Sequence, residues 1–167
     1  GFIGGMDIPL IHKFECGYAQ GFKAAKPDGK VIINYTGTTP AAWNDPVKGG
    51  ELLKAQGAQG ADVVYAAAGG TGIGVLQAAA DANILSIGVD SNQNHLHPGT
   101  MLTSLVKPVD LAVEQAFRGI RPGITALGLK EGGLDYAVDQ HNQKLLTPAM
   151  RRSAEAARAD IIAGRLK

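Results

Sequence analysis

The 167-residue sequence has little of three features that often reveal a function class: cysteine, net charge and long apolar runs. Its single cysteine, Cys16, excludes an internal disulfide, and we expect a small buried side chain on a helix there. The formal net charge of +1 argues against nucleic acid as the main partner, because domains that bind nucleic acid usually carry a clear basic excess. No run of about eighteen apolar residues is present, so we expect no membrane-spanning segment.

Motifs that carry catalytic or metal chemistry are also missing from the sequence. No Ser-His-Asp spacing, nucleophile elbow or paired carboxylate site stands out, so we predict no catalytic residues. His95 and His97 form an H-x-H pair in a polar loop, but no third ligand stands at the spacing that a metal site needs. We therefore expect neither a metal nor a cofactor.

What the sequence does contain is an alternation of strand-like and helix-like segments, with a period of roughly thirty residues. This alternation predicts one α/β domain, a parallel sheet with helices on both faces. Asn44 or Asp45 is expected to cap the helix that Pro46 begins. Residues 124–138 break the rhythm and are expected to form a strand, a turn and an extended piece of a different sheet. The predicted strands are 1–5, 30–37, 61–68, 84–90 and 100–107, and the predicted helices are 8–25, 44–60, 71–83, 108–120 and 147–167.

Four glycines, Gly69, Gly70, Gly72 and Gly74, lie between a predicted strand and a predicted helix. They match neither a dinucleotide fingerprint nor a P-loop, because Val75 stands where each motif needs another residue. Two interpretations stay open. The glycines serve only the packing of a tight turn, or their backbone N–H groups face a ligand at the start of the helix without requiring a phosphate.

Three side chains follow the carboxyl ends of predicted strands, the edge at which open parallel sheets bind ligands. The indole of Trp43 suits stacking on a flat ligand, although a lid on the core explains it equally well. The carboxylate of Asp90 suits two vicinal hydroxyls, or else it caps a turn. Beside it, Lys107 would supply an ion pair and a hydrogen-bond donor, or else it is merely solvated.

Six stretches, in order, are GFIGGMDIPLIHKFECGYAQGFKAA, AAWNDPVKG, GADVVYAAAGGTGIGVLQAAAD, SIGVDSNQN, LTSLVK and LKEGGLDYAV. Together they resemble the basic membrane protein family, the purine-nucleoside receptor type of substrate-binding lipoproteins that serve ABC importers. The resemblance extends over essentially the whole chain. It implies a flavodoxin-like lobe of a type I periplasmic binding protein that binds a nucleoside without catalysis. It also implies an ABC permease as partner and a bacterial, extracytoplasmic, membrane-anchored location.

The resemblance assigns roles to the residues at the strand ends. Trp43 stands where the family has an aromatic side chain that stacks on the base, and Gly69, followed by Gly70, stands where backbone meets the ribose. Asp90 matches the aspartate that binds the ribose hydroxyls, and Lys107 matches the lysine that joins it. The alternatives are an enzyme acting on a nucleoside or sugar, with Asp90 as its acid or base, and a structural lobe without a ligand.

The resemblance further implies that family members carry roughly a hundred residues, about the size of a lobe, before the strand that corresponds to GFIGG. We therefore expect residues 1–107 to form the second lobe, and residues 108–167 to contain crossing segments and a terminal helix. A nucleoside held by one lobe keeps a face in water, which weakens binding. Self-association through the face that lacks the other lobe, or through a sheet edge, is also expected.

Overall fold

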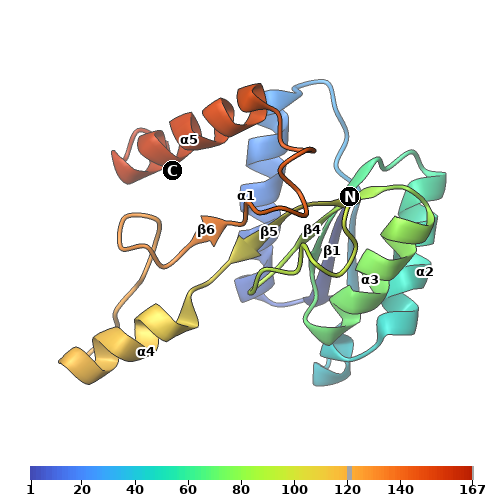
Figure 1. Cartoon of the computed structure of the whole chain (residues 1–167). Helices are drawn as coiled ribbons and strands as arrows, with labels where there is room; N and C mark the ends of the chain where they lie inside the picture. Colours follow the sequence, from blue (N-terminus) through green and yellow to red (C-terminus); the bar gives the residue numbers. More distant parts are fainter. Residues whose placement is uncertain (120–121, 167) are drawn as a thin grey trace.

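A computed structural model of the chain, which describes residues 1–119 and 122–166, contains one six-stranded sheet with helices on both faces (Figure 1). The strand order is β2-β1-β3-β4-β5-β6, and the pairings from β2 through β5 are parallel. The predicted α/β class with a parallel sheet is confirmed. The strands are β1 (Phe2–Met6), β2 (Ile33–Gly37), β3 (Val63–Ala67), β4 (Leu85–Gly88), β5 (Met101–Val106) and β6 (Asp135–Tyr136).

The helices begin close to the residues that the sequence signals predict. Asp45, and not Asn44, caps the second long helix, because its carboxylate accepts the backbone N–H of Lys48 at 3.0 Å. Thr147 caps the last helix in the same way, accepting the N–H of Met150 at 3.2 Å. The helices are α1 (Pro9–Ala25), the 3₁₀ turn η1 (Pro40–Trp43), α2 (Pro46–Ala58), α3 (Gly70–Asp81), α4 (Val109–Arg118) and α5 (Pro148–Ile162).

The core consists of two apolar clusters on opposite faces of the sheet. Phe2 and Ile3 are neighbours in β1 and both are fully buried, but Phe2 packs in the cluster with α1, whereas Ile3 packs in the cluster with α2 and α3. Successive side chains of a strand point to opposite faces, which explains the division. Each large apolar side chain that is buried on either face stabilises the fold by about 1.5–3 kcal/mol. The two clusters together hold the strand ends in place.

Gly74 allows α2 and α3 to pack closely against each other. A Cβ atom at Gly74 would lie only 1.8 Å from the carbonyl oxygen of Pro46, at the start of α2. A Cβ atom at Gly72, two residues earlier, would lie 3.7 Å from its nearest neighbours in Ala66, which is ordinary contact. For Gly74, the packing interpretation of the glycine cluster is therefore correct.

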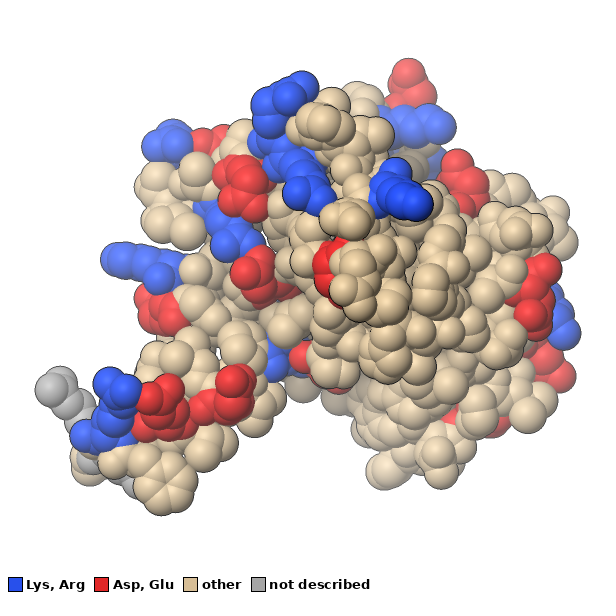
Figure 2. Space-filling model, viewed as in Figure 1, with Lys and Arg blue, Asp and Glu red and all other residues tan. Residues whose placement is uncertain are grey.

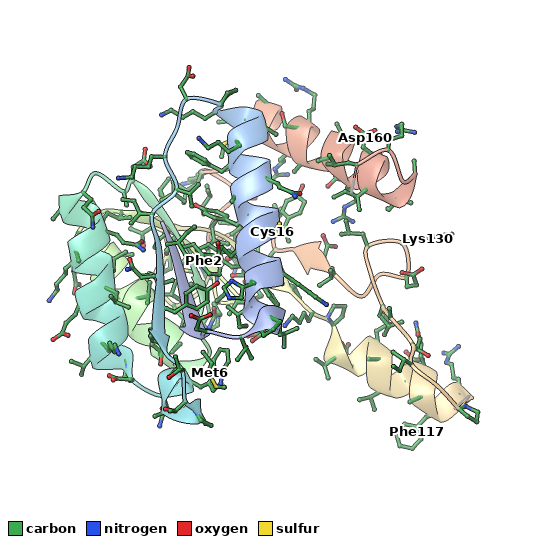
Figure 3. The ribbon with its side chains drawn as sticks, turned by 180° about the vertical axis from the view of Figure 1, so that it is seen from behind. Phe2, Met6, Cys16, Phe117, Lys130 and Asp160 are labelled. Carbon is green, nitrogen blue, oxygen red and sulfur yellow. The ribbon has the colours of Figure 1, made fainter. Side chains whose placement is uncertain are left out.

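Three details differ from the sequence-based expectations. Cys16 is exposed rather than buried, because it lies on the side of α1 away from the residues that face the sheet (Figure 3). No strand forms in residues 124–129, and the short β6 pairs antiparallel with β5 instead of joining a different sheet. The pairing satisfies part of the open edge that β5 would otherwise present. The predicted helix ends at residues 120 and 167 lie outside the described residues.

Helix α4 projects away from the sheet, and its far end, at Phe117, lies apart from the main body (Figures 1 and 3). None of its residues is buried. Val109, Val113 and Phe117 nevertheless recur every four residues, and they are 65%, 50% and 89% exposed. Residues four apart share one side of a helix, so α4 carries an apolar stripe that no described part of the chain covers.

Charged side chains of both signs are interspersed over the face that Figure 2 shows. Several form ion pairs within or between neighbouring elements, such as the pair of Arg118 and Glu114 on α4. This distribution fits the formal net charge of +1. It leaves no large field of a single sign on this face.

His12, in α1, lies between two carboxylates. Its Nε2 atom is 2.8 Å from Oδ1 of Asp7, and its Nδ1 atom is 3.1 Å from Oε2 of Glu15. The hydroxyl of Tyr35 lies 2.9 Å from the same Nδ1 atom. The hydrogen bond to Glu15 raises the pKa of His12 most, desolvation opposes it, and the interactions with Asp7 raise it further.

Replacing His12 by glutamine is expected to change how stability depends on pH. Because the folded-state pKa is raised above 6.5, protonated His12 stabilises the fold at lower pH, and this contribution is lost as pH rises through the folded pKa. The difference in free energy of unfolding between the wild type and His12→Gln should therefore be larger at about pH 6 than at about pH 8. Urea denaturation at the two pH values measures it. A difference that grows with pH would contradict the assignment.

Candidate ligand-binding site

Four of the five predicted binding residues line one hollow at the carboxyl edge of the sheet. Trp43 comes from η1, Gly69 precedes α3, Asp90 follows β4, and Lys107 follows β5. The hollow has a volume of about 210 Å³. It lies at the edge where β1 ends at Met6, the edge at which η1 also lies (Figure 3). The structure thus brings these residues together, and their binding of a ligand stays a prediction.

Asp90 and Lys107 form an ion pair within this hollow. The ammonium Nζ lies 2.6 Å from Oδ1 of Asp90, and the backbone N–H of Lys107 also donates to the carbonyl of Asp90 at 2.9 Å. The side chains are 57% and 38% exposed, respectively, so a ligand can reach them. The carboxylate has a second acceptor oxygen and the ammonium has further N–H donors, a combination that suits neighbouring hydroxyl groups.

The backbone of Asp90 has an uncommon conformation. Its φ angle is +68°, in the left-handed region that aspartate adopts more readily than most non-glycine residues. Such conformations cost free energy and cluster at functional sites. The turn at the end of β4 directs the carboxylate of Asp90 toward Lys107, which follows the adjacent strand β5.

Trp43 is partly buried and borders both the core and the hollow. A Cβ atom at Gly5 would lie 2.2 Å from its ring, and a Cβ atom at Gly69 would lie 3.4 Å from it. Gly69 also has a φ angle of +56°, which favours glycine. The ring packs against the core cluster of Phe2 while it lines the hollow. The geometry therefore fits both interpretations, a lid on the core and a platform for a ligand.

Gly70 is not among the residues that line the hollow. A Cβ atom there would lie 3.0 Å from the carbonyl oxygen of Trp43, so Gly70 allows η1 to approach the start of α3. Thr71 strengthens this junction, since its hydroxyl donates to the carbonyl of Ala42 and accepts the N–H of Asp45, both at 2.7 Å. Gly70 and Thr71, at the start of α3, thus help to hold η1 and its Trp43 in position.

Phe14 is a residue of the hollow that sequence reasoning did not assign. The ammonium of Lys107 lies 4.6 Å from the centre of its ring, which is a favourable cation–π distance. The helical spacing of Ile11 and Phe14 shows that they share the apolar side of α1, but it does not place them beside a residue 93 positions later. The remaining lining comes from Leu10, Ile11, Ala67 and Val89.

Two further observations concern metals and membranes. No three His, Cys, Asp or Glu side chains among residues 1–119 and 122–166 are placed to hold a metal ion together. Within the same residues, no helix combines the length and the apolar character needed to cross a bilayer.

The fold and the hollow together define a lobe of the class found in ABC solute-binding proteins. Over its full length the chain matches 56% of a solute-binding protein from Aeropyrum pernix, with a TM-score of 0.83 and 28% identity. A solute-binding protein from Conexibacter woesei shows the same fold at a TM-score of 0.75 and 21% identity, with 55% of that chain covered. The expected lobe architecture is confirmed.

The chain belongs to the Bmp family, described as ABC transporter substrate-binding protein PnrA-like, which matches residues 1–158. It is 34% identical to the ABC transporter nucleoside-binding protein BmpA of Lactococcus lactis, over 99% of this chain and 51% of that protein. Basic membrane protein D of Borreliella burgdorferi is 34% identical over 84% of this chain and 43% of its own length. The resemblance noted in the sequence is confirmed, and the chain spans about half the length of these relatives.

Proposed function

We propose that the chain is the second-lobe half of an ABC importer's substrate-binding protein and that it binds a purine nucleoside without catalysis. The observation that supports this most is the meeting of Trp43, Asp90 and Lys107 in one hollow. An indole face suits a flat purine, while a carboxylate paired with an ammonium suits the vicinal hydroxyls of a ribose. Gly69 adds backbone that carries no side chain, against which the sugar can lie.

The same proposal includes a partner and a location. A permease of the ABC type would receive the ligand, because the family is one of ABC transporter substrate-binding proteins. An extracytoplasmic, membrane-anchored location is supported by relatives such as an uncharacterized lipoprotein of the archaeon Pyrococcus furiosus, 38% identical over 81% of this chain and 37% of its own length. The bacterial part of the proposal is supported by the relatives from Lactococcus lactis and Borreliella burgdorferi. The nucleoside ligand is supported by the name of the Lactococcus lactis relative.

Trp43, the sole tryptophan, provides the test. Titration with adenosine or guanosine should change its fluorescence in a saturable way, because a base stacked on the indole alters its environment. The matched control ligand is 2′,3′-dideoxyadenosine, which keeps the base and lacks both hydroxyls that would donate hydrogen bonds to the carboxylate of Asp90. It should bind more weakly, and equal affinity for the two would contradict the assigned ribose contact. Release of free base from adenosine would instead indicate an enzyme.

We also propose that the apolar stripe of α4 packs against the first lobe of the family, with residues 1–107 as the second lobe and residues 108–167 as crossing segments and terminal helix. The stripe of Val109, Val113 and Phe117 has no cover among the described residues, and the relatives are about twice as long as this chain. Exposed apolar surface of this kind marks a site of association.

The isolated chain is therefore expected to self-associate through α4 as its concentration rises. Phe117→Lys should shift it toward the monomer in size-exclusion chromatography with light scattering, because a charge in the stripe opposes its burial. Val47→Lys is the matched control, since Val47 is also exposed, at 71%, but lies at the start of α2. Equal association of the wild type and Phe117→Lys would exclude this surface.

A further inference from the structure

We propose that Asp139 is a positioning residue for Asp90, because its carboxylate fixes the loop of residues 90–94 that presents Asp90 to a ligand. Asp139 follows β6 and is not among the residues that line the hollow. It acts through the 90–94 loop and does not touch the ligand. The effect on nucleoside binding rests on the proposed function, whereas the effect on the position of Asp90 does not.

Two side-chain amides join the 90–94 loop to the carboxylate of Asp139. Asn92 donates to Oδ2 of Asp139 at 2.7 Å, and Asn94 donates to the same oxygen at 3.1 Å. The backbone N–H of Asn94 also donates to Oδ1 of Asn92 at 3.0 Å, which ties the loop to itself. Asn94 is fully buried, so loss of the carboxylate acceptor would leave a buried donor without a partner.

Ser104, in β5, connects the same loop to the sheet. Its hydroxyl donates to Oδ1 of Asn94 at 2.8 Å and accepts the backbone N–H of Gln93 at 3.0 Å. The side chain of Gln93 in turn accepts the N–H of Val89 at 2.9 Å. The chain is therefore held on both sides of Asp90.

Asp139 is itself held in place by its surroundings. Its Oδ1 atom accepts the backbone N–H of His141 at 2.7 Å, and its own N–H donates to Oδ1 of Asn142 at 2.9 Å. Asn142 is fully buried, and its amide donates to the carbonyls of Leu102 and Ala137 at 2.9 and 2.8 Å. These contacts fix the carboxylate against β5, the strand that pairs with β4.

The chemistry at this point requires a carboxylate. The hydrogen bond from Asn92 lowers the pKa of Asp139 most, desolvation opposes this, and the backbone N–H of His141, the amide of Asn94 and the charge of His141 lower it further. The ionised carboxylate only accepts hydrogen bonds, and these neighbours donate to it. Asparagine has the same shape, but its amide nitrogen would face N–H groups in either orientation.

The conformation of Asp90 explains why the loop needs such support. Its φ angle of +68° is one that persists only where the surrounding structure holds it. Its carbonyl accepts the N–H of Lys107 at 2.9 Å, and its carboxylate lies 2.6 Å from the ammonium of Lys107. Relaxation of the loop would weaken both contacts and would move the carboxylate from its place in the hollow.

The first test compares two ligands by isothermal titration calorimetry, at a temperature where every variant is folded. Asp139→Asn should bind adenosine about three- to tenfold more weakly than the wild type. Its affinity for 2′,3′-dideoxyadenosine should stay within about twofold, because this ligand has no ribose hydroxyls to donate to Asp90. Asp81→Asn is the matched control, since Asp81 also accepts a side-chain amide, that of Gln77 at 2.9 Å, but at the end of α3. Should Asp139→Asn fail to fold, Asn92→Ala truncates only an exposed side chain and should show the same pattern.

The second test is amide hydrogen exchange, which needs no ligand. In Asp139→Asn, the N–H of Lys107 that donates to the carbonyl of Asp90 should exchange at least about tenfold faster than in the wild type. The N–H of Leu85, at the other end of β4, donates to the carbonyl of Asp62 at 3.1 Å and should exchange as before.

Three results would overturn the proposal. They are unchanged exchange at Lys107, unchanged affinity of Asp139→Asn for adenosine, and an equal loss of affinity for the two ligands, which would show a general loosening of the fold. If the wild type binds no adenosine but exchange at Lys107 responds as expected, the proposed function fails and the positioning of Asp90 by Asp139 stands.

Discussion

Replacing Asp90 by alanine is expected to weaken purine nucleoside binding by about ten- to a hundredfold. The substitution removes both carboxylate acceptors that the proposed ribose contact needs, and it leaves Lys107 without the partner that now lies 2.6 Å away. An ammonium without its partner is no longer held toward the ligand, so the two losses act in the same direction. Isothermal titration calorimetry with adenosine measures the change in affinity.

Alanine at this position also introduces backbone strain, since the φ angle of Asp90 is +68°. Asp90→Asn separates the two effects, because asparagine tolerates this conformation and removes only the charge. It should also weaken binding. Asp160→Asn is the matched control, as Asp160 forms an equally short ion pair, 2.6 Å from Arg165, at the end of α5. Asp160→Asn should bind adenosine as well as the wild type does. If Asp90→Asn also bound it equally well, the assigned role of Asp90 would be wrong.

Gly74→Ala is expected to destabilise the fold by about 1–3 kcal/mol. The added methyl group would lie 1.8 Å from the carbonyl oxygen of Pro46, which is backbone and cannot rotate away as a side chain can. The start of α2 is also held by the cap of Asp45 and by the hydrogen bond from its N–H to Thr71. The helices must therefore separate, with a loss of core packing.

Gly72→Ala provides the control for this prediction. A methyl group there makes ordinary contacts at 3.7 Å, and alanine favours a helix by roughly 1 kcal/mol over glycine. The Gly72 variant should therefore be as stable as the wild type or more so in urea denaturation. Equal stability of the two variants would mean that α2 and α3 do not approach as closely as the structure shows.

The glycine cluster illustrates how far sequence reasoning reaches. The pattern excluded two phosphate motifs through Val75, but it left packing and ligand contact as open alternatives. The structure divides the cluster, because Gly69 lines the hollow whereas Gly74 allows α2 and α3 to pack closely. Whether a glycine lines the hollow or allows helices to pack depends on the positions of η1 and α2, elements formed by residues more than ten positions away. No local pattern contains that information.

Elements that differ from expectation have the same explanation. The pattern of residues 124–138 predicted a strand, a turn and an extended piece, but a strand also needs a neighbour with free backbone groups. Only Asp135–Tyr136 finds one, at the edge that β5 offers. Cys16 is predicted as a small buried side chain on a helix, but its angular position on α1 decides its exposure, and that depends on which side of α1 faces the sheet.

The sequence by itself determined the alternation of strands and helices, the approximate starts of the helices, the absence of a known phosphate motif and the family. These follow from short-range periodicity and from residue types, which act within a few positions of the chain. Only the tertiary structure decided that Asp90 pairs with Lys107 beside Phe14, that β6 joins β5, and that the hydroxyl of Tyr65 lies buried without a partner among the described residues. These arrangements depend on the order of strands in the sheet and on how the helices lie across it, because both bring distant residues together.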